Sequence, residues 1–362
     1  MSAPQGPPVD VWRGRSVLLT GHTGFKGSWL ALWLNQLGAR VHGYALDPPT
    51  EPNLFAVAGV GRLLASDTRA DLADQRRLQA SFEQIQPEVV FHLAAQSLVR
   101  EGYRDPLGTF ATNVLGTAAV LECARTCSSV RALVVITTDK VYENRESLHA
   151  YREGDRLGGV DPYSASKAAA EIVSASYRSS FFSREWPQLA TARAGNVIGG
   201  GDWAVDRLVP DCLRAFAAGN SVRLRYPNAL RPWQHVLEPL AGYLQLASQL
   251  LGHGSTRYAR AWNFGPGPDA DATVAQVAGI VARLWGSGAR IEADSDGEHP
   301  HEAGLLRLDS EAARTALGWA PRWSLKEALG HTVRWHQAWL AGDDVQTLSL
   351  EQIEAYQQAA AQ

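Results

Sequence analysis

The feature that most constrains the fold is a stretch near the N-terminus where an aliphatic run breaks into three evenly spaced glycines. Residues 17–20 are long enough for one buried strand. Gly21, Gly24 and Gly27 follow, and apolar residues then recur at helical spacing over residues 29–37. This order predicts a pyrophosphate cradle, because glycines let backbone N–H groups approach phosphates and the helix N-terminus carries partial positive charge. Three glycines alone would also suit any tight turn, so further motifs must decide.

The composition is that of a globular chain. Of its 362 residues, 45% are hydrophobic and 20% are charged, and the formal net charge is −3. This length predicts two domains or one large domain, and neither the charge nor any basic run indicates a nucleic-acid partner. Cys123, Cys127 and Cys212 are too few for a disulfide framework and are expected to be buried thiols. We find no signal-peptide pattern and no apolar run of transmembrane length, and expect a cytoplasmic protein without a membrane partner.

Strands and helices are predicted to alternate along the first half of the chain. Further strands are expected at residues 41–46, 62–66, 88–93, 132–137 and 189–193, with helices at 71–85, 106–127 and 162–182. Such alternation builds a parallel sheet with helices on both faces. The predicted fold class is therefore α/β, with a doubly wound parallel sheet of the Rossmann type. Ligands of such sheets bind outside the carboxyl ends of the strands.

The pattern loosens after residue 193. Helices are expected at 207–218, 237–250, 274–284 and 325–340, and a short strand at 261–264. We expect a cofactor-binding domain over residues 1–195, to which part of 236–265 returns. A smaller α/β substrate-binding domain would comprise 196–235 and 266–345. Residues 346–362 would form a C-terminal tail, in which the polar residues 351–362 are expected to be a loosely docked helix or tail.

A tyrosine and a lysine four residues apart carry the first candidate chemistry. On a helix, Tyr163 and Lys167 lie one above the other, so the ammonium can sit near the phenol. A nearby positive charge favours the phenolate and lowers a pKa that is ordinarily about 10. Tyr163 is therefore a candidate proton acceptor, although such a pair in isolation is more often a solvated one.

Together with the glycine turn, this pair resembles the extended short-chain dehydrogenase/reductase superfamily, over about residues 12–340. Further matches are Asp67-Thr68-Arg69, Leu93-Ala94-Ala95 and Asn113-Val114-x-Gly116-Thr117. The resemblance implies that these segments respectively approach the adenine, line the cofactor cleft and stabilise the fold near the active site. The implied cofactor contacts come from the glycine turn, three strand ends and the catalytic helix: Gly21, Thr23, Gly24, Phe25, Lys26, Gly27, Asp47, Asp67, Thr68, Leu93, Ala94, Ala95, Tyr163 and Lys167.

Within the superfamily, the chain resembles the CDP-glucose 4,6-dehydratase family most closely. The stretches that carry this resemblance are residues 21–30, 137–142, 193–203 and 231–236. It implies that Tyr163, assisted by Thr138, deprotonates the glucose 4-hydroxyl while C4 is oxidised by NAD. Lys140 would then remove the C5 proton and Asp139 would protonate the departing 6-hydroxyl, before hydride returns to C6. The product would be CDP-4-keto-6-deoxyglucose, and a tightly held NAD is expected because no net redox change occurs.

The base at C5 has an alternative. A lysine must be neutral to act as a base, and Asp139 beside Lys140, if ionised, raises the lysine pKa. Glu143 lies three residues on and is the second candidate.

The cofactor is expected to be NAD rather than NADP. Asp47 ends the second predicted strand, where a carboxylate can bind the ribose hydroxyls. No arginine follows that strand closely, as a 2′-phosphate would prefer. Lys26, in the glycine turn, argues the other way, since its side chain could reach a phosphate.

On the substrate side, the resemblance places polar side chains around a nucleotide diphosphate: Gln96, Asn196, Arg207, Arg231 and His235. Guanidinium groups suit diphosphate oxygens. Trp203 and Trp233 either pack near the sugar and base or belong to the core. The two histidines in residues 299–302 are a poor metal signal, and no metal is expected.

Two other functions remain open. One is a different nucleotide-sugar enzyme, either a 4,6-dehydratase for another nucleotide or a 4-epimerase. The other is a non-catalytic dinucleotide-binding regulator. Thr138, Tyr163 and Lys167 argue against the second. The superfamily commonly dimerises through helices matching 106–127 and 162–182, so a homodimer or higher oligomer is expected.

Overall fold

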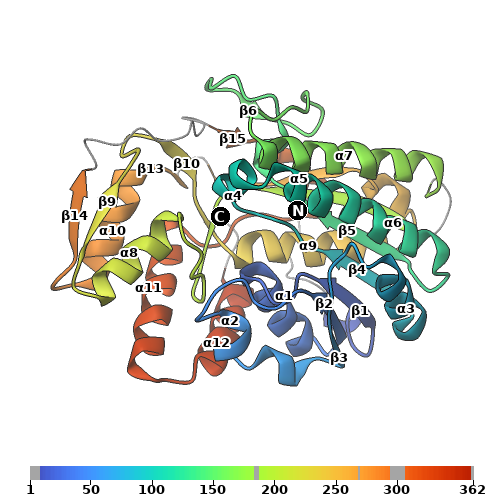
Figure 1. Cartoon of the computed structure of the whole chain (residues 1–362), viewed down its shortest axis with the longest axis horizontal. Coiled ribbons are helices and arrows are strands. Elements are labelled where there is room, and N and C mark those ends of the chain that lie inside the picture. The colour runs from blue at the N-terminus through green and yellow to red at the C-terminus, as the bar shows by residue number, and fades with distance from the viewer. Residues whose placement is uncertain (1–8, 183–186, 268–269, 294–305, 360–362) are drawn as a thin grey trace.

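A seven-stranded sheet forms the centre of the computed structural model, which describes residues 9–182, 187–267, 270–293 and 306–359 (Figure 1). Its strand order is β12-β7-β5-β4-β1-β2-β3, and every neighbouring pair is parallel. The strands are β1 (Ser16–Thr20), β2 (Arg40–Ala45), β3 (Ser66–Arg69), β4 (Val89–His92), β5 (Ala132–Ile136), β7 (Gln188–Ala194) and β12 (Ala261–Phe264). The predicted fold class is confirmed.

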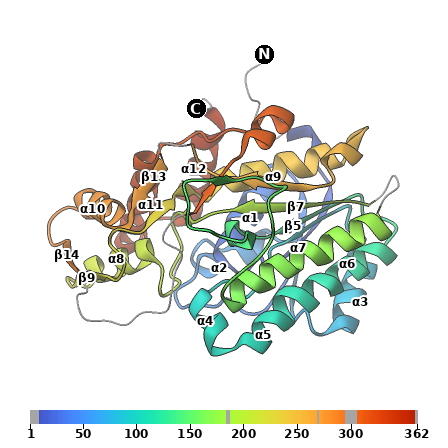
Figure 2. The same cartoon turned by 90° about the horizontal axis from the view of Figure 1, so that it is seen from above.

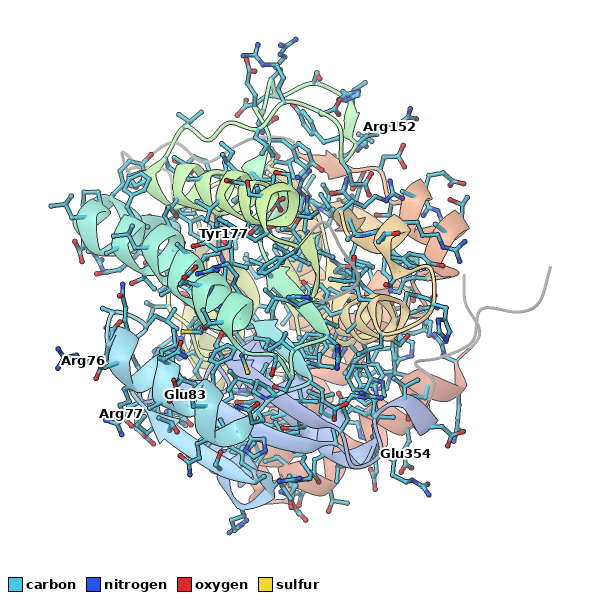
Figure 3. All side chains as sticks on the ribbon, turned by 90° about the vertical axis from the view of Figure 1, so that its right-hand side faces the viewer. Arg76, Arg77, Glu83, Arg152, Tyr177 and Glu354 are labelled. Carbon is cyan, nitrogen blue, oxygen red and sulfur yellow. The ribbon has the colours of Figure 1, made fainter. Side chains whose placement is uncertain are left out.

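Helices cover both faces of this sheet because its strands are apolar on both sides. In β1, Val17 and Leu19 belong to one hydrophobic core and Leu18 to the other, as the alternation of side chains along a strand requires. The two layers are visible on either side of the strands in Figure 2. The first contains α1 (Phe25–Gln36) and α9 (Leu237–Leu250), and the second contains α3 (Gln75–Ile85), α6 (Gly116–Thr126) and α7 (Pro162–Ser180). Arg76, Arg77 and Glu83 of α3 point outward from this second layer (Figure 3).

The predicted position of the third strand, residues 62–66, is wrong. Residues 60–63 form a 3₁₀ turn, and the strand begins four residues later than expected, at Ser66 opposite His42 of β2. The reason is that a short apolar run does not by itself distinguish a strand from a buried turn. Asp67, Thr68 and Arg69 are consequently part of β3 itself.

The long helix predicted at 106–127 consists of α5 (Pro106–Phe110), a π-helical turn (Ala111–Leu115) and α6. Contrary to the sequence prediction, this run has the length and the mean hydropathy, 1.2, of a possible membrane span. It packs on α3 and α7, as the core helix of a globular protein does.

The C-terminal half is built from short paired strands and three helices around its own hydrophobic core, followed by a fourth helix that belongs to the core of the sheet half. The pairs are β8 (Val197–Ile198) with β11 (Gln234–His235), β9 (Ser221–Leu224) with β14 (Arg290–Ala293), β10 (Leu230–Pro232) with β13 (Asp271–Thr273), and β6 (Ala150–Tyr151) with β15 (Arg307–Leu308). The helices are α8 (Leu208–Ala217), α10 (Val274–Trp285), α11 (Leu325–Ala341) and α12 (Val345–Gln358). Short helices α2 (Leu54–Val57) and α4 (Val99–Arg104) lie in the first half. We call the central sheet with its two helix layers the sheet half, and α8, α10, α11 and their strands the C-terminal half.

The C-terminal segment is not a loosely docked tail. Helix α12 packs on α1 and α11, with Ile353 and Tyr356 fully buried. The Tyr356 hydroxyl donates to Glu238 of α9 at 2.6 Å, and the Arg322 guanidinium donates to the carbonyl of Gln357 at 2.7 Å. Glu354, on the outer side of the helix (Figure 3), accepts a hydrogen bond from Gln36.

Candidate active site

The backbone of the glycine turn packs so closely that two of its glycines cannot be replaced by a residue with a Cβ atom unless the backbone moves. A Cβ atom at Gly27 would lie 2.1 Å from the carbonyl oxygen of Gly21. Gly21 has φ of +75°, and a Cβ there would lie 2.6 Å from the backbone nitrogen of Ala94. The turn therefore holds the N-terminus of α1 directly above the ends of β1 and β4, where a pyrophosphate would meet its N–H groups.

A cavity of about 1020 Å³ opens at the carboxyl ends of the strands and continues to α8 and β9. Most of the predicted site residues line it: Gly21, Thr23, Gly24, Phe25, Lys26, Gly27, Asp47, Leu93, Ala94, Ala95, Gln96, Thr138, Asp139, Lys140, Tyr163, Lys167, Asn196, Arg207 and Arg231. Trp203 and Trp233 also line it, and both are nearly buried. The structure therefore brings the predicted cofactor, catalytic and substrate residues together in one cavity.

Three predicted residues do not line this cavity. His235 is fully buried in the core, where its ring packs against Trp29 and Trp323, so the structure does not place it with the substrate residues. Asp67 is held by His22 at 2.9 Å and by two hydrogen bonds from Arg69. Thr68 lies in β3 opposite Tyr44.

The end of β5 supplies a hydroxyl, an acid and a base. Thr138 is the N-cap of a 3₁₀ turn (Asp139–Val141), and its hydroxyl donates to Asp139 Oδ1 at 3.0 Å. Lys140 Nζ donates to the same oxygen at 3.2 Å and to Asn196 Oδ1 at 3.4 Å. The Asp139 side chain is almost fully buried, whereas that of Lys140 is partly exposed. The acid and the base are thus already hydrogen-bonded to each other inside the cavity.

Helix α7 delivers Tyr163 and Lys167 beside this turn, with Asp161 as its N-cap. Burial raises the pKa of the Tyr163 phenol, although the nearby cation of Lys140 and the Thr138 side chain oppose the increase. The expectation of a lowered phenol pKa is therefore wrong for the protein alone, because burial outweighs the charges around it. Lys167 Nζ donates to the backbone carbonyl of Ile136 at 2.9 Å.

Three of the four lysines in the chain meet in this cavity, namely Lys26, Lys140 and Lys167. Burial and the cations of Arg207, Lys167 and Lys140 together lower the pKa of Lys26 to about 7, while Asp139 opposes the decrease. Burial also lowers the pKa of Lys167 to about 8. Two of the three ammonium groups are thus close to releasing a proton near neutral pH.

Glu143, the alternative base, lies outside the cavity lining. Its carboxylate is paired with Arg145 at 3.8 Å and with Arg156 at 3.3 Å. A glutamate engaged this way is poorly placed to abstract a proton from a substrate in the cavity.

The sequence prediction missed several charged side chains around the substrate end of the cavity. Asp206 accepts from Arg225 at 2.7 Å and pairs with Arg100 at 3.2 Å, while Arg207 donates to Asp202 at 3.0 Å. These residues come from α4, the loop before α8 and the end of β9. Their spacing in the sequence gives no signal, because only the folded chain brings them together.

At the other end, an arginine does lie near the predicted ribose site. Strand β3 brings Arg69 to within 3.2 Å of Asp47, whose side chain is 89% exposed, and Arg69 also stacks over Phe55 at 4.6 Å. The same guanidinium is bound by both oxygens of Asp67. Two carboxylates therefore share the positive charge of Arg69.

No group of three His, Cys, Asp or Glu side chains that could hold a metal occurs within the described ranges. Residues 299–302, which contain the two histidines, lie outside them. The three cysteines are buried and free, as predicted.

Comparisons with known proteins define the class to which this fold and site belong. Residues 18–332 match the family model described as GDP-mannose 4,6 dehydratase, and the chain belongs to this family of nucleotide-sugar 4,6-dehydratases. The chain is 47% identical to the CDP-glucose 4,6-dehydratase of Salmonella typhimurium, over 97% of this chain and 98% of that protein. It is 30% identical to the dTDP-glucose 4,6-dehydratase of Streptomyces griseus, over 89% of this chain and 95% of the relative.

Solved structures agree on the fold. A double mutant of dTDP-glucose 4,6-dehydratase from Streptomyces venezuelae, solved with NAD, superimposes with a TM-score of 0.75 at 24% identity, covering 91% of this chain and 98% of the other. UDP-glucose 4-epimerase from Brucella ovis in complex with NAD gives 0.74 at 22% identity, covering 88% and 97%.

Proposed function

We propose that this protein is a CDP-glucose 4,6-dehydratase, converting CDP-glucose to CDP-4-keto-6-deoxyglucose and water. The observation that carries the proposal is the hydrogen-bonded pair of Asp139 and Lys140 beside Tyr163 in the cavity, in a chain 47% identical to an enzyme of that name. A 4-epimerase needs a proton acceptor for the 4-hydroxyl but no acid and base for C5 and C6. The pair therefore supports a dehydratase over an epimerase and over a non-catalytic regulator.

NAD is the cofactor that the site fits. The glycine turn puts the N-terminus of α1 beside the ends of β1 and β4, which suits a pyrophosphate, and related proteins of this fold were solved with NAD. Asp47 and Asp67 flank Arg69, so the ribose end carries two carboxylates and one guanidinium. This charge balance suits ribose hydroxyls better than a 2′-phosphate. Bound there, NAD would supply the hydride acceptor for C4 and, once reduced, the hydride donor for C6.

Tyr163 and Thr138 would act on the 4-hydroxyl. Both side chains line the cavity, and Lys167 lies one helical turn from Tyr163 along α7. In the proposed first step, Tyr163 accepts the hydroxyl proton while Thr138 holds the developing oxygen in place. Asn196, Arg207 and Arg231 line the same cavity and would bind the nucleotide diphosphate.

Asp139 and Lys140 would perform the elimination. Because they share a hydrogen bond of 3.2 Å, passing one proton from the ammonium to the carboxylate turns the ion pair into a neutral acid and a neutral base. Neutral Lys140 then takes the C5 proton, and protonated Asp139 gives its proton to the leaving 6-hydroxyl. The transfer removes the difficulty of a charged lysine acting as a base.

Turnover in D2O tests this proposal directly. A dehydratase should give a product lighter by one water, with one deuterium at C5, because that proton is exchanged with solvent. CDP-glucose is compared with dTDP-, UDP- and GDP-glucose in the same assay. A product of unchanged mass without deuterium would contradict the dehydratase assignment, and a preference for another nucleotide would correct the substrate.

Two variants separate the candidate bases. Lys140→Met should still allow oxidation at C4 but stall before elimination, leaving reduced cofactor visible by absorbance, with turnover lowered at least about 100-fold. Glu143→Gln is the matched control and should stay within about two-fold of the parent, because its carboxylate lies outside the cavity lining. The opposite ranking would make Glu143 the base.

A homodimer formed through the second helix layer is also part of this proposal. Leu107 of α5, Leu115 of the π-helical turn and Ile172 of α7 expose 82%, 67% and 59% of their surface, which is costly for apolar side chains left in water. Sedimentation velocity should show a dimer that Leu115→Glu with Ile172→Glu converts to monomer. Arg76→Glu on the neighbouring outward face is the control. A monomeric parent would contradict this part.

A further inference from the structure

Glu171 is a fully enclosed carboxylate one helical turn beyond Lys167 on α7. It accepts hydrogen bonds from four donors: Thr137 Oγ1 at 2.6 Å, Thr191 Oγ1 at 2.7 Å, Arg193 Nε at 2.9 Å and Arg193 Nη2 at 2.9 Å. The side chains of Glu171 and Arg193 are each only 3% exposed. Burying a carboxylate costs several kcal/mol unless it is fully paired, so such a complete set of donors is a strong positional constraint.

Two partners of Glu171 connect it to the segment that carries the catalytic groups, residues 137–142. Thr137 directly precedes Thr138 at the end of β5. Arg193 also donates to the Tyr142 hydroxyl at 2.8 Å, and that hydroxyl donates to Asn263 Oδ1 of β12 at 2.7 Å. Both ends of residues 137–142 are therefore tied to Glu171, one directly and one through Arg193. Since Glu171 sits on the helix that carries Tyr163 and Lys167, it fixes the distance between the two halves of the catalytic set.

Glu171 also acts on the charge of Lys167. Burial lowers the pKa of Lys167 to about 8, and the negative charge of Glu171 opposes that decrease. Within the part of the chain that the structure describes, no other titratable group near Lys167 supplies it with a negative charge. Burial and the Lys167 cation hold the pKa of His92 at about 3, so His92 is neutral, and Lys26 is itself a base whose pKa Lys167 helps to lower.

We propose that Glu171 is a positioning residue for the reaction, holding the 137–142 turn against α7 and supporting the positive charge of Lys167. The proposal rests on the proposed function for its activity readout, but the state of Lys167 can be measured without substrate. Arg193 completes the arrangement, because it balances the Glu171 charge and carries the link to Tyr142.

The test compares Glu171→Gln, which keeps the shape but loses the charge, with Glu171→Asp, which keeps the charge. Since the chain has four lysines, selective ¹³Cε-lysine labelling gives few NMR resonances, and Lys167→Arg assigns the one of interest. In the full-length protein, Glu171→Gln should lower the pKa of Lys167 by about one unit, and Glu171→Asp should restore it to within about 0.3 units. If the single variant does not fold, the double variant Arg193→Met with Glu171→Gln replaces it, because the double variant leaves no unpaired cation. It should show the same decrease in the pKa of Lys167.

Activity gives the second readout. In Glu171→Gln, the pH at which kcat falls to half on the alkaline side of its pH profile should decrease by about one unit. The KM for CDP-glucose should change less than about three-fold. An unchanged Lys167 pKa, or a loss of kcat that is equal at every pH, would overturn the inference. A parent that fails to dehydrate any nucleotide sugar would instead overturn the proposed function, while the NMR titration would still decide the role of Glu171.

Discussion

The two halves of the molecule hold their share of the cavity in different ways. In the sheet half, the backbone itself shapes the site: strand ends and the glycine turn meet at distances that no added side chain would fit. In the C-terminal half, side-chain pairs shape it, such as Asp206 with Arg225 and Arg207 with Asp202. A backbone-built site depends on the fold and resists change, whereas a side-chain-built site can be altered residue by residue. The cofactor end should therefore tolerate few substitutions and the substrate end many.

The largest effect is expected in the glycine turn. Gly27→Ala would place a Cβ 2.1 Å from the Gly21 carbonyl oxygen, so the turn must open, at a cost of about 3 kcal/mol in the free energy of unfolding and with loss of NAD binding. Thermal unfolding and NAD titration measure both quantities.

Gly24→Ala is the control for stability, because its nearest neighbour would be 3.4 Å away and its φ is −78°. It should cost no more than about 1 kcal/mol. Equal losses at both glycines would contradict the idea that close backbone approach distinguishes this half.

A smaller effect is expected where the two halves meet. Burial raises the pKa of Glu238 from an ordinary value near 4.5 to about 7, although Tyr356 and two backbone N–H groups oppose the increase. A carboxyl that holds its proton longer in the folded state stabilises the protein below about pH 4.5, and this contribution is lost as the pH rises to about 7. The difference in the free energy of unfolding, Glu238→Gln minus parent, should therefore be about 2 kcal/mol larger at pH 8 than at pH 5. Denaturant unfolding of both proteins at both pH values measures it.

Glu354→Gln, on the outer side of α12, is the matched control for this comparison. It should differ from the parent by less than about 0.5 kcal/mol at both pH values. A similar pH dependence in both variants would show that Glu238 is not the group responsible.

The smallest effect, and the only gain, is expected in the C-terminal half. Gly330 lies inside α11, and a Cβ added there would meet no atom within 4 Å beyond the helix's own backbone. Gly330→Ala should therefore raise the free energy of unfolding by about 0.5–1 kcal/mol. Equilibrium denaturation measures it, and activity should be unchanged. A loss of stability would mean that this half is packed as tightly as the glycine turn.

What the sequence could predict follows the same division. Where apolar periodicity ran into a regular sheet, the strands and helices were found nearly in place. The residues that motifs singled out in the glycine turn, at the end of β5 and on α7 line one cavity. The prediction that His235 binds the substrate was wrong because a motif gives the order of residues but not which of them enter the core. The ring of His235 packs in the core against Trp29 and Trp323. Glu171 was missed because one glutamate on an otherwise ordinary helix has no local signal.

The C-terminal helix was misjudged for a related reason. Its composition is polar, yet Ile353 and Tyr356 fall on one face at helical spacing and are fully buried. The apolar residues of this segment do not by themselves predict docking, because their partners on α1 and α9 lie far earlier in the chain.

That docking has a consequence for synthesis on the ribosome. Trp33 of α1 packs edge-on against Tyr356 of α12, with ring centroids 5.7 Å apart, so the first helix keeps an apolar face open until the last helix has been made. The nascent chain must therefore carry this exposed tryptophan surface through almost all of its translation. Chaperones that bind apolar segments would meet it there, and a stop codon that removes α12 would leave the face permanently uncovered, producing a chain prone to aggregation.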